Sequence, residues 1–427
     1  MGVGSATVVV VANMIGTGIF TTTGAMLSFG LQPRMVLLCW LLGGLIALAG
    51  ALCYAELATT MPRAGGEYVY LREIYGPLPA FLTGWTSFFV GFAAPGAAAA
   101  VGAAKYLAAA QLLPQGLLAE RALALLFVAG LTAIHFCGLR LGARAQNALT
   151  GLNVTLLLVL ILAGFAAHNA DWSFLSQANA TAAAPLGLGT ALLLAMFAYS
   201  GWNAAAYLSE EVCEPARTLP RSLLLGTATV TVLYLLLNLV YLAGASAKAL
   251  SGQIAVAEIA VRNLFGSTAA TWLALLISLG LVSALSAYTL IGPRVYYAMA
   301  RDGLFFRFAA QVHPRFRTPS LSIVAQGVGA SVMVLTGTFE QLLFYIGFAL
   351  GIFPCMAVLG LLLLRRRDPN RTRPYRVWGY PLTPLFFLVA MAAILAVSFA
   401  ARPRPALWAI ATVAAGIPAY FLTASRR

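Results

Sequence analysis

The first apolar run of the chain contains the stretch NMIGTGIF at residues 13–20. Two glycines, Gly16 and Gly18, bracket a threonine near the middle of this run, and each weakens a helix by about 1 kcal/mol relative to alanine. A later apolar run contains FAYSGWN at residues 197–203, where glycine and polar side chains again fall inside the run. These patterns predict two interrupted helices.

The composition places these runs in a membrane. Of the 427 residues, 61% are hydrophobic and 9% are charged, whereas a soluble globular protein carries about 25% charged residues. This composition excludes a soluble enzyme, a disordered protein and a DNA-binding domain. A spanning helix needs about 20 mostly apolar residues, and on that rule we predict twelve spans. They lie near residues 5–29, 35–60, 79–104, 122–138, 146–167, 186–209, 222–246, 269–299, 321–336, 341–364, 381–401 and 406–424.

The basic residues divide unequally between the two sides of this all-α integral membrane protein. With the N-terminus in the cytoplasm and alternating spans, 19 of the 26 basic residues fall inside and 7 outside. This asymmetry sets orientation, so both termini are predicted to be cytoplasmic in a multi-pass plasma membrane protein. The cluster at 365–376 is interpreted as a topology and lipid-headgroup anchor and not as a nucleic-acid site. The Ala-rich, Arg-over-Lys composition favours a bacterial inner membrane.

The two interruptions have a chemical consequence. Unpaired backbone at membrane depth is tolerated only where it lines a cavity or is buried in protein. An unwound helix offers N–H groups at the start of one half and C=O groups at the end of the other, which suit the carboxylate and ammonium of an amino acid. Close helix packing also explains a single Gly-x-Gly. Two breaks at corresponding positions of two five-helix halves favour an inverted-repeat transporter instead.

Four stretches together resemble the amino acid–polyamine–organocation permeases, and most nearly their L-amino acid transporter-like branch. The stretches are residues 13–20; Tyr54 to Leu57 with Pro62, Gly65, Gly66 and Tyr68 to Leu71; Phe197 to Asn203 with Glu210, Glu211 and Pro215 to Arg221; and Arg294 to Gly303 with His313, Pro314, Arg315, Thr318 and Pro319. The resemblance implies a LeuT-like core of two inverted five-helix repeats, residues 1–168 and 186–366. Residues 381–424 would form two peripheral helices.

The resemblance also implies a substrate site at the two breaks. The substrate carboxylate would meet Gly16, Thr17 and Gly18. The ammonium would meet carbonyls near Met14 and Ile15 and those of Phe197, Ala198 and Ser200. Phe197 matches the aromatic gate of the family, although ordinary core packing also explains a phenylalanine there, and Asn203 matches a polar position beside the site.

The twelve acidic residues bear on the substrate. The predicted spans put all of them at helix ends or in loops, so no buried carboxylate is expected for a polyamine or cationic substrate. We therefore predict a neutral amino acid. The other titratable group at mid-membrane depth is His135, which fits either a satisfied structural histidine or a proton carrier.

Three polar residues, Asn153, Ser283 and Ser286, bear on whether an ion is coupled to transport. Asn153 stands where the branch often places a lysine that bridges the first helix to the eighth. With Ser283 and Ser286 it fits either a cation site or a hydrogen-bonded bridge. We predict sodium-independent exchange or facilitated transport, with proton- or sodium-coupled symport as the alternative.

Two other classes of protein were weighed. A membrane-embedded enzyme needs a catalytic constellation, and His135, His168 and His313 sit in unrelated contexts, so no catalytic residue, metal or cofactor is predicted. A non-transporting nutrient sensor on the same scaffold would usually carry a long soluble tail. The expected partners are an amino acid and membrane lipid. Because residues 105–121 hold no cysteine, no disulfide-linked heavy chain is expected, and the chain would be a monomer or a weak homo-oligomer.

Overall fold

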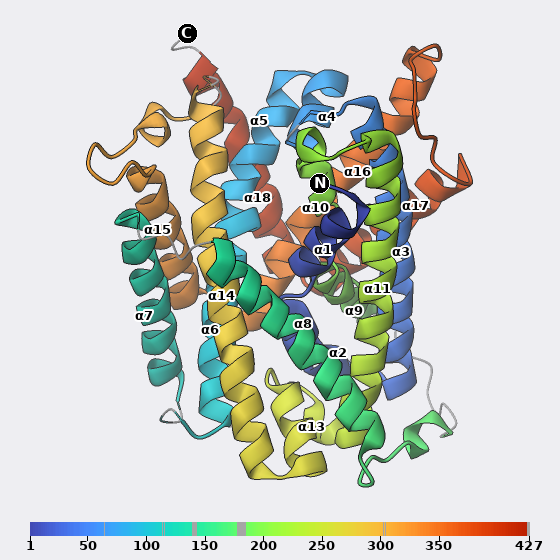
Figure 1. Ribbon diagram of the computed structural model, residues 1–427, viewed down its shortest axis with the longest axis vertical. Coiled ribbons are helices and arrows are strands. Elements are labelled where there is room, and N and C mark those ends of the chain that lie inside the picture. Colours follow the sequence, from blue (N-terminus) through green and yellow to red (C-terminus); the bar gives the residue numbers. More distant parts are fainter. Residues whose placement is uncertain are drawn as a thin grey trace.

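The computed structural model describes residues 1–427 except 64, 113, 115, 139–142, 177–184, 302, 304 and 425–427. The described residues form helices and no strand, which confirms the all-α class (Figure 1). The first half contains α1 (Val3–Met14), α2 (Thr17–Ser28), α3 (Pro33–Thr60), α4 (Glu67–Tyr75), α5 (Pro77–Thr86), the π-helix Ser87–Ala93, α6 (Ala94–Ala109), α7 (Leu117–Phe136) and α8 (Ala143–Ala166). The second half contains α9 (Pro185–Ala198), α10 (Ala204–Tyr207), α11 (Pro215–Gly244), α12 (Ala247–Leu250), α13 (Val256–Phe265), α14 (Ser267–Arg301), α15 (Ser320–Thr336), α16 (Phe339–Arg367), α17 (Leu382–Ala401) and α18 (Pro403–Ala424).

Many of these helices have the length and composition of membrane spans. Among the described residues, eight helical segments are long and apolar enough to cross a bilayer, and α1 with α2 forms one further span bent by 43°. Three shorter apolar helices cover Gly151–Ala166, Pro185–Ala198 and Ser320–Thr336. Each run predicted from the sequence overlaps one of these helices or helix pairs, although the run 186–209 extends well beyond Pro185–Ala198.

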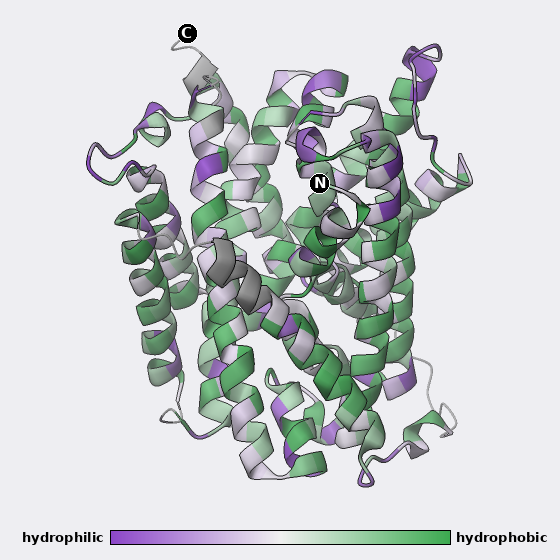
Figure 2. Ribbon diagram, in the orientation of Figure 1, coloured by the Kyte–Doolittle hydropathy of each residue, from purple (hydrophilic) through white to green (hydrophobic). Residues whose placement is uncertain are grey.

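The bundle separates apolar helices from polar loops. Figure 2 shows mainly hydrophobic residues along the helices, with hydrophilic residues gathered in the loops at their ends. The connection from α14 to α15 and the one from α16 to α17 lie at the same end as the last turn of α18 (Figure 1). The two basic loops predicted to share one side of the membrane therefore share one end of the bundle.

Apolar side chains cover the outside of the bundle as well as its interior. Leu118 on α7 is 84% exposed and Leu162 on α8 is 71% exposed. Exposed leucines on so many helices are expected where lipid replaces water as the solvent. In the interior, α6 buries a run of alanines and packs against α14, because small side chains let two backbones approach closely.

Several short helical segments, among them α4, α13 and the π-helix, were not anticipated. The short amphipathic helices α4 and α13 lie in connections between spans, and the π-helix Ser87–Ala93 interrupts the third span. Helices of nine and ten residues fall below the length of a spanning run, so a search for apolar stretches passes over them. A single π-helical segment has no composition signature of its own, although such segments often occur at functional sites.

Candidate functional site

The first interruption separates α1 from α2. The helix α1 ends at Met14, residues 15 and 16 are non-helical, and α2 begins at Thr17 with Gly16 as its N-cap. The first N–H groups of a helix have no partner within that helix. Gly16, Thr17 and Gly18 therefore present backbone donors at the break, as the sequence predicts, and the positive end of the α2 dipole lies there.

The second interruption separates α9 from α10. The helix α9 ends at Ala198, and five residues pass before α10 begins at Ala204. Gly201 in this segment has a φ of +97°, a conformation that glycine adopts without strain. Phe197 is buried at the end of α9, and its carbonyl accepts the Ser200 N–H at 3.0 Å.

The structure brings the two interruptions into direct contact. A Cβ built on Gly18 would lie 2.4 Å from the Cα of Ala198. A Cβ built on Gly201 would lie 2.7 Å from the carbonyl oxygen of Asn13. Each glycine thus lets its own segment approach the backbone of the other interrupted span. Close packing therefore explains both glycines, and it also places the backbone groups of the two breaks side by side.

A tyrosine that the sequence reasoning missed connects the same two breaks. The Tyr234 hydroxyl on α11 donates to the Met14 carbonyl at 2.5 Å and lies 3.3 Å from the Ala198 carbonyl. Both carbonyls belong to the predicted ammonium site. Tyr234 is completely buried, and the ring of Trp40 packs edge-on against it. One hydroxyl therefore holds the ends of α1 and α9 together.

The sequence does contain a signal for this residue. Tyr234 and Asn238 are polar groups four residues apart inside the apolar run of α11, so they lie on one face of the helix. Asn238 is completely buried, and its Oδ1 accepts the Thr23 hydroxyl of α2 at 2.5 Å. Polar side chains within a spanning helix point to function or to contact with another helix, and both residues reach the interrupted first span.

Asn203 has a partner that the sequence did not predict. Its Nδ2 donates to Oε1 of Glu67 on α4 at 2.9 Å, and the Tyr54 hydroxyl donates to the same oxygen at 2.7 Å. The side chain predicted to lie beside the substrate thus links the second break to a carboxyl group.

The expectation that no carboxylate is buried is wrong. Glu56, Glu67 and Glu258 are each less than a tenth exposed. They do lie toward helix ends, but other parts of the chain cover those ends. A sequence shows the position of a residue along a span, but not which other elements cover it from the side.

The residues predicted to couple or bridge helices are distributed around α14. The Asn153 side chain of α8 lies against Gly280, where a built Cβ would be 2.1 Å from its Oδ1. That oxygen is buried and has no hydrogen-bond partner among the described residues. Ser286 lies 2.9 Å from Nε2 of His135 on α7, so both polar groups have a partner. Ser283 is also buried on α14.

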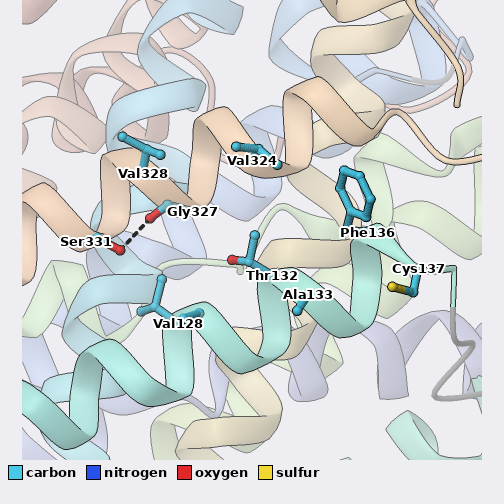
Figure 3. Close-up of a pocket in the computed structure, with 10 residues that line it drawn as sticks. Val128, Thr132, Ala133, Phe136, Cys137, Val324, Gly327, Val328 and Ser331 are labelled. Atoms are coloured by element: carbon cyan, nitrogen blue, oxygen red, sulfur yellow. Dashed lines mark hydrogen bonds between the residues drawn. The ribbon is translucent and has the colours of Figure 1, made fainter.

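An open groove lies away from the interruptions, between α7 and α15. Figure 3 shows this groove, which encloses about 380 Å³. Its lining residues include Val128, Thr132, Phe136 and Cys137 from one side and Val324, Val328 and Ser331 from the other. The lining is mainly apolar, and Val328 is 57% exposed. No residue of either break lines it, so this groove is separate from the candidate site.

Comparison with known proteins identifies the family to which this apolar helical bundle belongs. A family model described as amino acid permease matches residues 1–419. The chain belongs to the amino acid permease family. This permease is 30% identical to the serine/threonine exchanger SteT of Bacillus subtilis (strain 168) over 96% of the chain and 94% of that relative.

Two animal proteins are similar over almost the whole chain. The Asc-type amino acid transporter 1 of Mus musculus is 30% identical, with 99% of the permease and 80% of the relative covered. The b(0,+)-type amino acid transporter 1 of Mus musculus is 28% identical, with 99% and 87% covered. The family and these relatives are membrane transporters of amino acids and not enzymes.

Proposed function

We propose that this permease exchanges neutral L-amino acids across the plasma membrane by alternating access. The observation that carries the proposal is the direct contact of the two interrupted helices. The close packing of Gly18 against Ala198 places the backbone donors of the first break beside the second break. The Tyr234 hydroxyl, which donates to the Met14 carbonyl, marks the backbone acceptors at the same place. A zwitterion needs both kinds of group within one small site.

The proposed binding mode uses backbone groups on both sides of the substrate. The carboxylate accepts hydrogen bonds from the N–H groups of Gly16, Thr17 and Gly18 at the positive end of α2. The ammonium donates to carbonyls near Met14 and Ile15 and to those of Phe197, Ala198 and Ser200. A carbonyl oxygen has two lone pairs, so the Met14 and Ala198 carbonyls can accept the ammonium beside the Tyr234 hydroxyl. Phe197 would cover the bound substrate as a gate.

A neutral side chain fits the residues at the breaks. Neither residues 13–20 nor residues 197–203 include a charged side chain. The carboxyl that contacts the second break, that of Glu67, is already bound by three side-chain donors. Two of the similar proteins are named for large neutral amino acids and for serine and threonine exchange.

The proposed architecture has twelve spans. Eight long segments, the bent pair and three shorter apolar helices match the predicted runs in order. Residues 1–168 and 186–366 form the two five-helix repeats of this proposal, and residues 381–424 form the peripheral pair. The basic loops that share one end of the bundle would face the cytoplasm together with both termini. We propose a monomer or weak homo-oligomer in a bacterial inner membrane, without a disulfide-linked heavy chain.

Counterflow in proteoliposomes tests this function. Vesicles loaded with an unlabelled neutral amino acid should accumulate the labelled form of the same amino acid. Vesicles without an internal amino acid should not. Excess leucine, alanine or serine should compete, whereas lysine or a polyamine should not. Replacement of sodium by choline should leave the rate unchanged, because Asn153, Ser283 and Ser286 are proposed to bridge helices without a bound sodium ion. Stronger competition by lysine, or loss of uptake in choline, would refute the corresponding part of the proposal.

A further inference from the structure

The carboxyl of Glu67 joins three elements near the second interruption. Glu67 is the first residue of α4 and is 8% exposed. Its Oε1 accepts from the Tyr54 hydroxyl of α3 and from the Asn203 amide that precedes α10. The Tyr207 hydroxyl at the end of α10 also hydrogen-bonds this carboxyl. A single carboxyl group therefore holds the second half of the interrupted helix against α3 and α4.

The backbone reinforces this contact. The ring of Tyr207 lies against Gly66, where a built Cβ would be 2.8 Å from the ring. The Gly65 N–H donates to the Tyr207 carbonyl at 3.2 Å. The helix α10 is thus seated directly on the turn that leads into α4, and it cannot move without uncovering Glu67.

Glu67 differs from the other buried carboxylates in its partners. Glu56 is paired with Arg365 at 2.5 Å, and Glu258 is paired with Arg262. Within the described parts of the chain, Glu67 takes part in no ion pair. Its partners are the neutral groups of Tyr54, Asn203 and Tyr207, and the further titratable group that faces it is the phenol of Tyr70 on its own helix.

The nearby cations are engaged with other groups. The helix α16 packs on α4, and basic residues of this region lie on α16 and in the connection that follows it. The helix α4 itself carries Arg72, whose Nη1 donates to the Tyr68 hydroxyl at 3.4 Å. Arg367 donates to the Ile74 carbonyl at 3.4 Å, and Arg371 pairs with Glu73. Both contacts lie on the later part of α4, so they do not compensate a negative charge on Glu67.

Burial without a cation favours the protonated carboxyl. Desolvation raises the pKa of Glu67 from 4.5 to about 7, although the hydrogen bonds from Tyr54, Tyr207 and Asn203 act in the opposite direction. If α10 moved away and water reached the carboxyl, its pKa would return toward 4.5. By linkage, the proton would then favour the packed arrangement.

We propose that Glu67 is a proton-binding site that controls the release of α10. The carboxyl holds its proton while α10 packs on α4, and it transfers that proton to water when α10 moves away and the site is hydrated. In the protonated state Oε1 still accepts from Tyr54 and Asn203, while the other oxygen can donate to the Tyr207 hydroxyl. This inference rests on the proposed function, because α10 is half of an interrupted helix that would move during transport.

The test compares wild type, Glu67→Gln and Glu210→Gln in proteoliposomes with the same pH on both sides. Counterflow is measured over about two pH units on each side of neutrality. Wild-type exchange should rise several-fold with pH, with a midpoint near neutrality. Glu67→Gln keeps an acceptor oxygen but cannot lose a proton, so it should exchange at the slow acidic rate at every pH. Glu210 is an exposed carboxylate three residues beyond Tyr207, so Glu210→Gln should follow the wild-type profile.

A second variant separates a protonation effect from a packing effect. Tyr54→Phe removes a donor that stabilises the ionised carboxyl, so the midpoint of the profile should move to higher pH. A packing defect alone would lower the rate at all pH values and leave the midpoint in place. An unshifted midpoint in Tyr54→Phe, or a wild-type profile in Glu67→Gln, would overturn the proposal.

Infrared titration of the purified protein in lipid nanodiscs gives a readout that does not depend on transport. The wild type should show a protonated-carboxyl band that disappears near neutral pH, and Glu67→Gln should lack this band. If wild type and Glu210→Gln exchange amino acids but no band titrates near neutrality, the proton site is refuted and the proposed function stands. If neither protein exchanges any amino acid, the proposed function fails whatever the band shows.

Discussion

At the scale of single residues, Tyr234 carries the most informative contact of the site. Its hydroxyl donates to the Met14 carbonyl and approaches the Ala198 carbonyl, where the substrate ammonium is proposed to bind. Tyr234→Phe should destabilise the ligand-free protein by about 1–3 kcal/mol, because buried carbonyls lose their donor. A bound amino acid would satisfy the same carbonyls, so substrate should raise the thermal unfolding temperature more in the variant than in wild type.

The matched control for Tyr234 lies on the same helix. The Tyr241 hydroxyl is buried on α11 and has no hydrogen-bond partner among the described residues. Tyr241→Phe should therefore leave both the unfolding temperature and its shift with substrate close to wild type. If Tyr234→Phe shows the same substrate shift as Tyr241→Phe, the Met14 and Ala198 carbonyls are not substrate ligands.

The sequence predicted the two helix breaks better than the side chains around them. Glycines inside an apolar run mark a broken helix directly, so residues 13–20 and 197–203 could be found without a structure. Tyr234 and Glu67 could not be placed, because their roles depend on which other elements pack against them. A sequence shows that Tyr234 is polar in an apolar helix, but only the bundle shows that it faces Met14.

At the scale of helices, the contact between the two interruptions makes a sharp prediction. Gly18→Ala would place a Cβ 2.4 Å from the Ala198 Cα, so α2 and α9 would have to separate. Overpacking of this kind destabilises a protein by about 1–3 kcal/mol, and here it would also pull the two sets of backbone groups apart. If that cost falls on the arrangement that transports, counterflow should fall by about 5- to 150-fold, since each 1.4 kcal/mol is a factor of ten.

A glycine in open space on α7 provides the control for Gly18. A Cβ built on Gly130 of α7 meets no atom within 4 Å, so Gly130→Ala should retain wild-type counterflow and stability. Equal exchange rates in Gly18→Ala and Gly130→Ala would show that transport does not require close contact of the two breaks.

The spans themselves were predictable because a bilayer imposes length and composition together. The predicted run 35–60 corresponds to α3 at Pro33–Thr60, and the predicted run 341–364 corresponds to α16 at Phe339–Arg367. The amphipathic helix α4 was not predicted, although it carries Glu67. Because its nine residues do not span the bilayer, its length and composition are not set by the bilayer. Its position comes from contacts with α3, α10 and α16.

At the scale of the whole molecule, Glu56 near the end of α3 contacts both the last turns of α16 and the connection that follows α16. Its two oxygens accept from Nε and Nη2 of Arg365 at 2.8 and 2.5 Å, and Oε2 also accepts the Val377 N–H at 2.6 Å. The sequence predicts this basic cluster to be an anchor at the membrane surface, whereas the structure shows that one of its members, Arg365, pairs internally with Glu56.

Removal of the Glu56 carboxylate should weaken the contact of α3 with α16 and with the connection that follows α16, and should lower the free energy of unfolding. Glu56→Gln leaves the Arg365 guanidinium without its counter-charge in a largely buried setting, a change that typically destabilises by about 3–5 kcal/mol. The exposed pair of Glu340 and Arg402 has both side chains nearly half exposed, so Glu340→Gln should change stability by roughly 0–1 kcal/mol. Thermal unfolding in detergent at several salt concentrations compares the two, because salt screens the exposed pair and leaves the buried pair largely unaffected. Equal unfolding temperatures for both variants would mean that the pair of Glu56 and Arg365 does not hold the connection after α16 against α3.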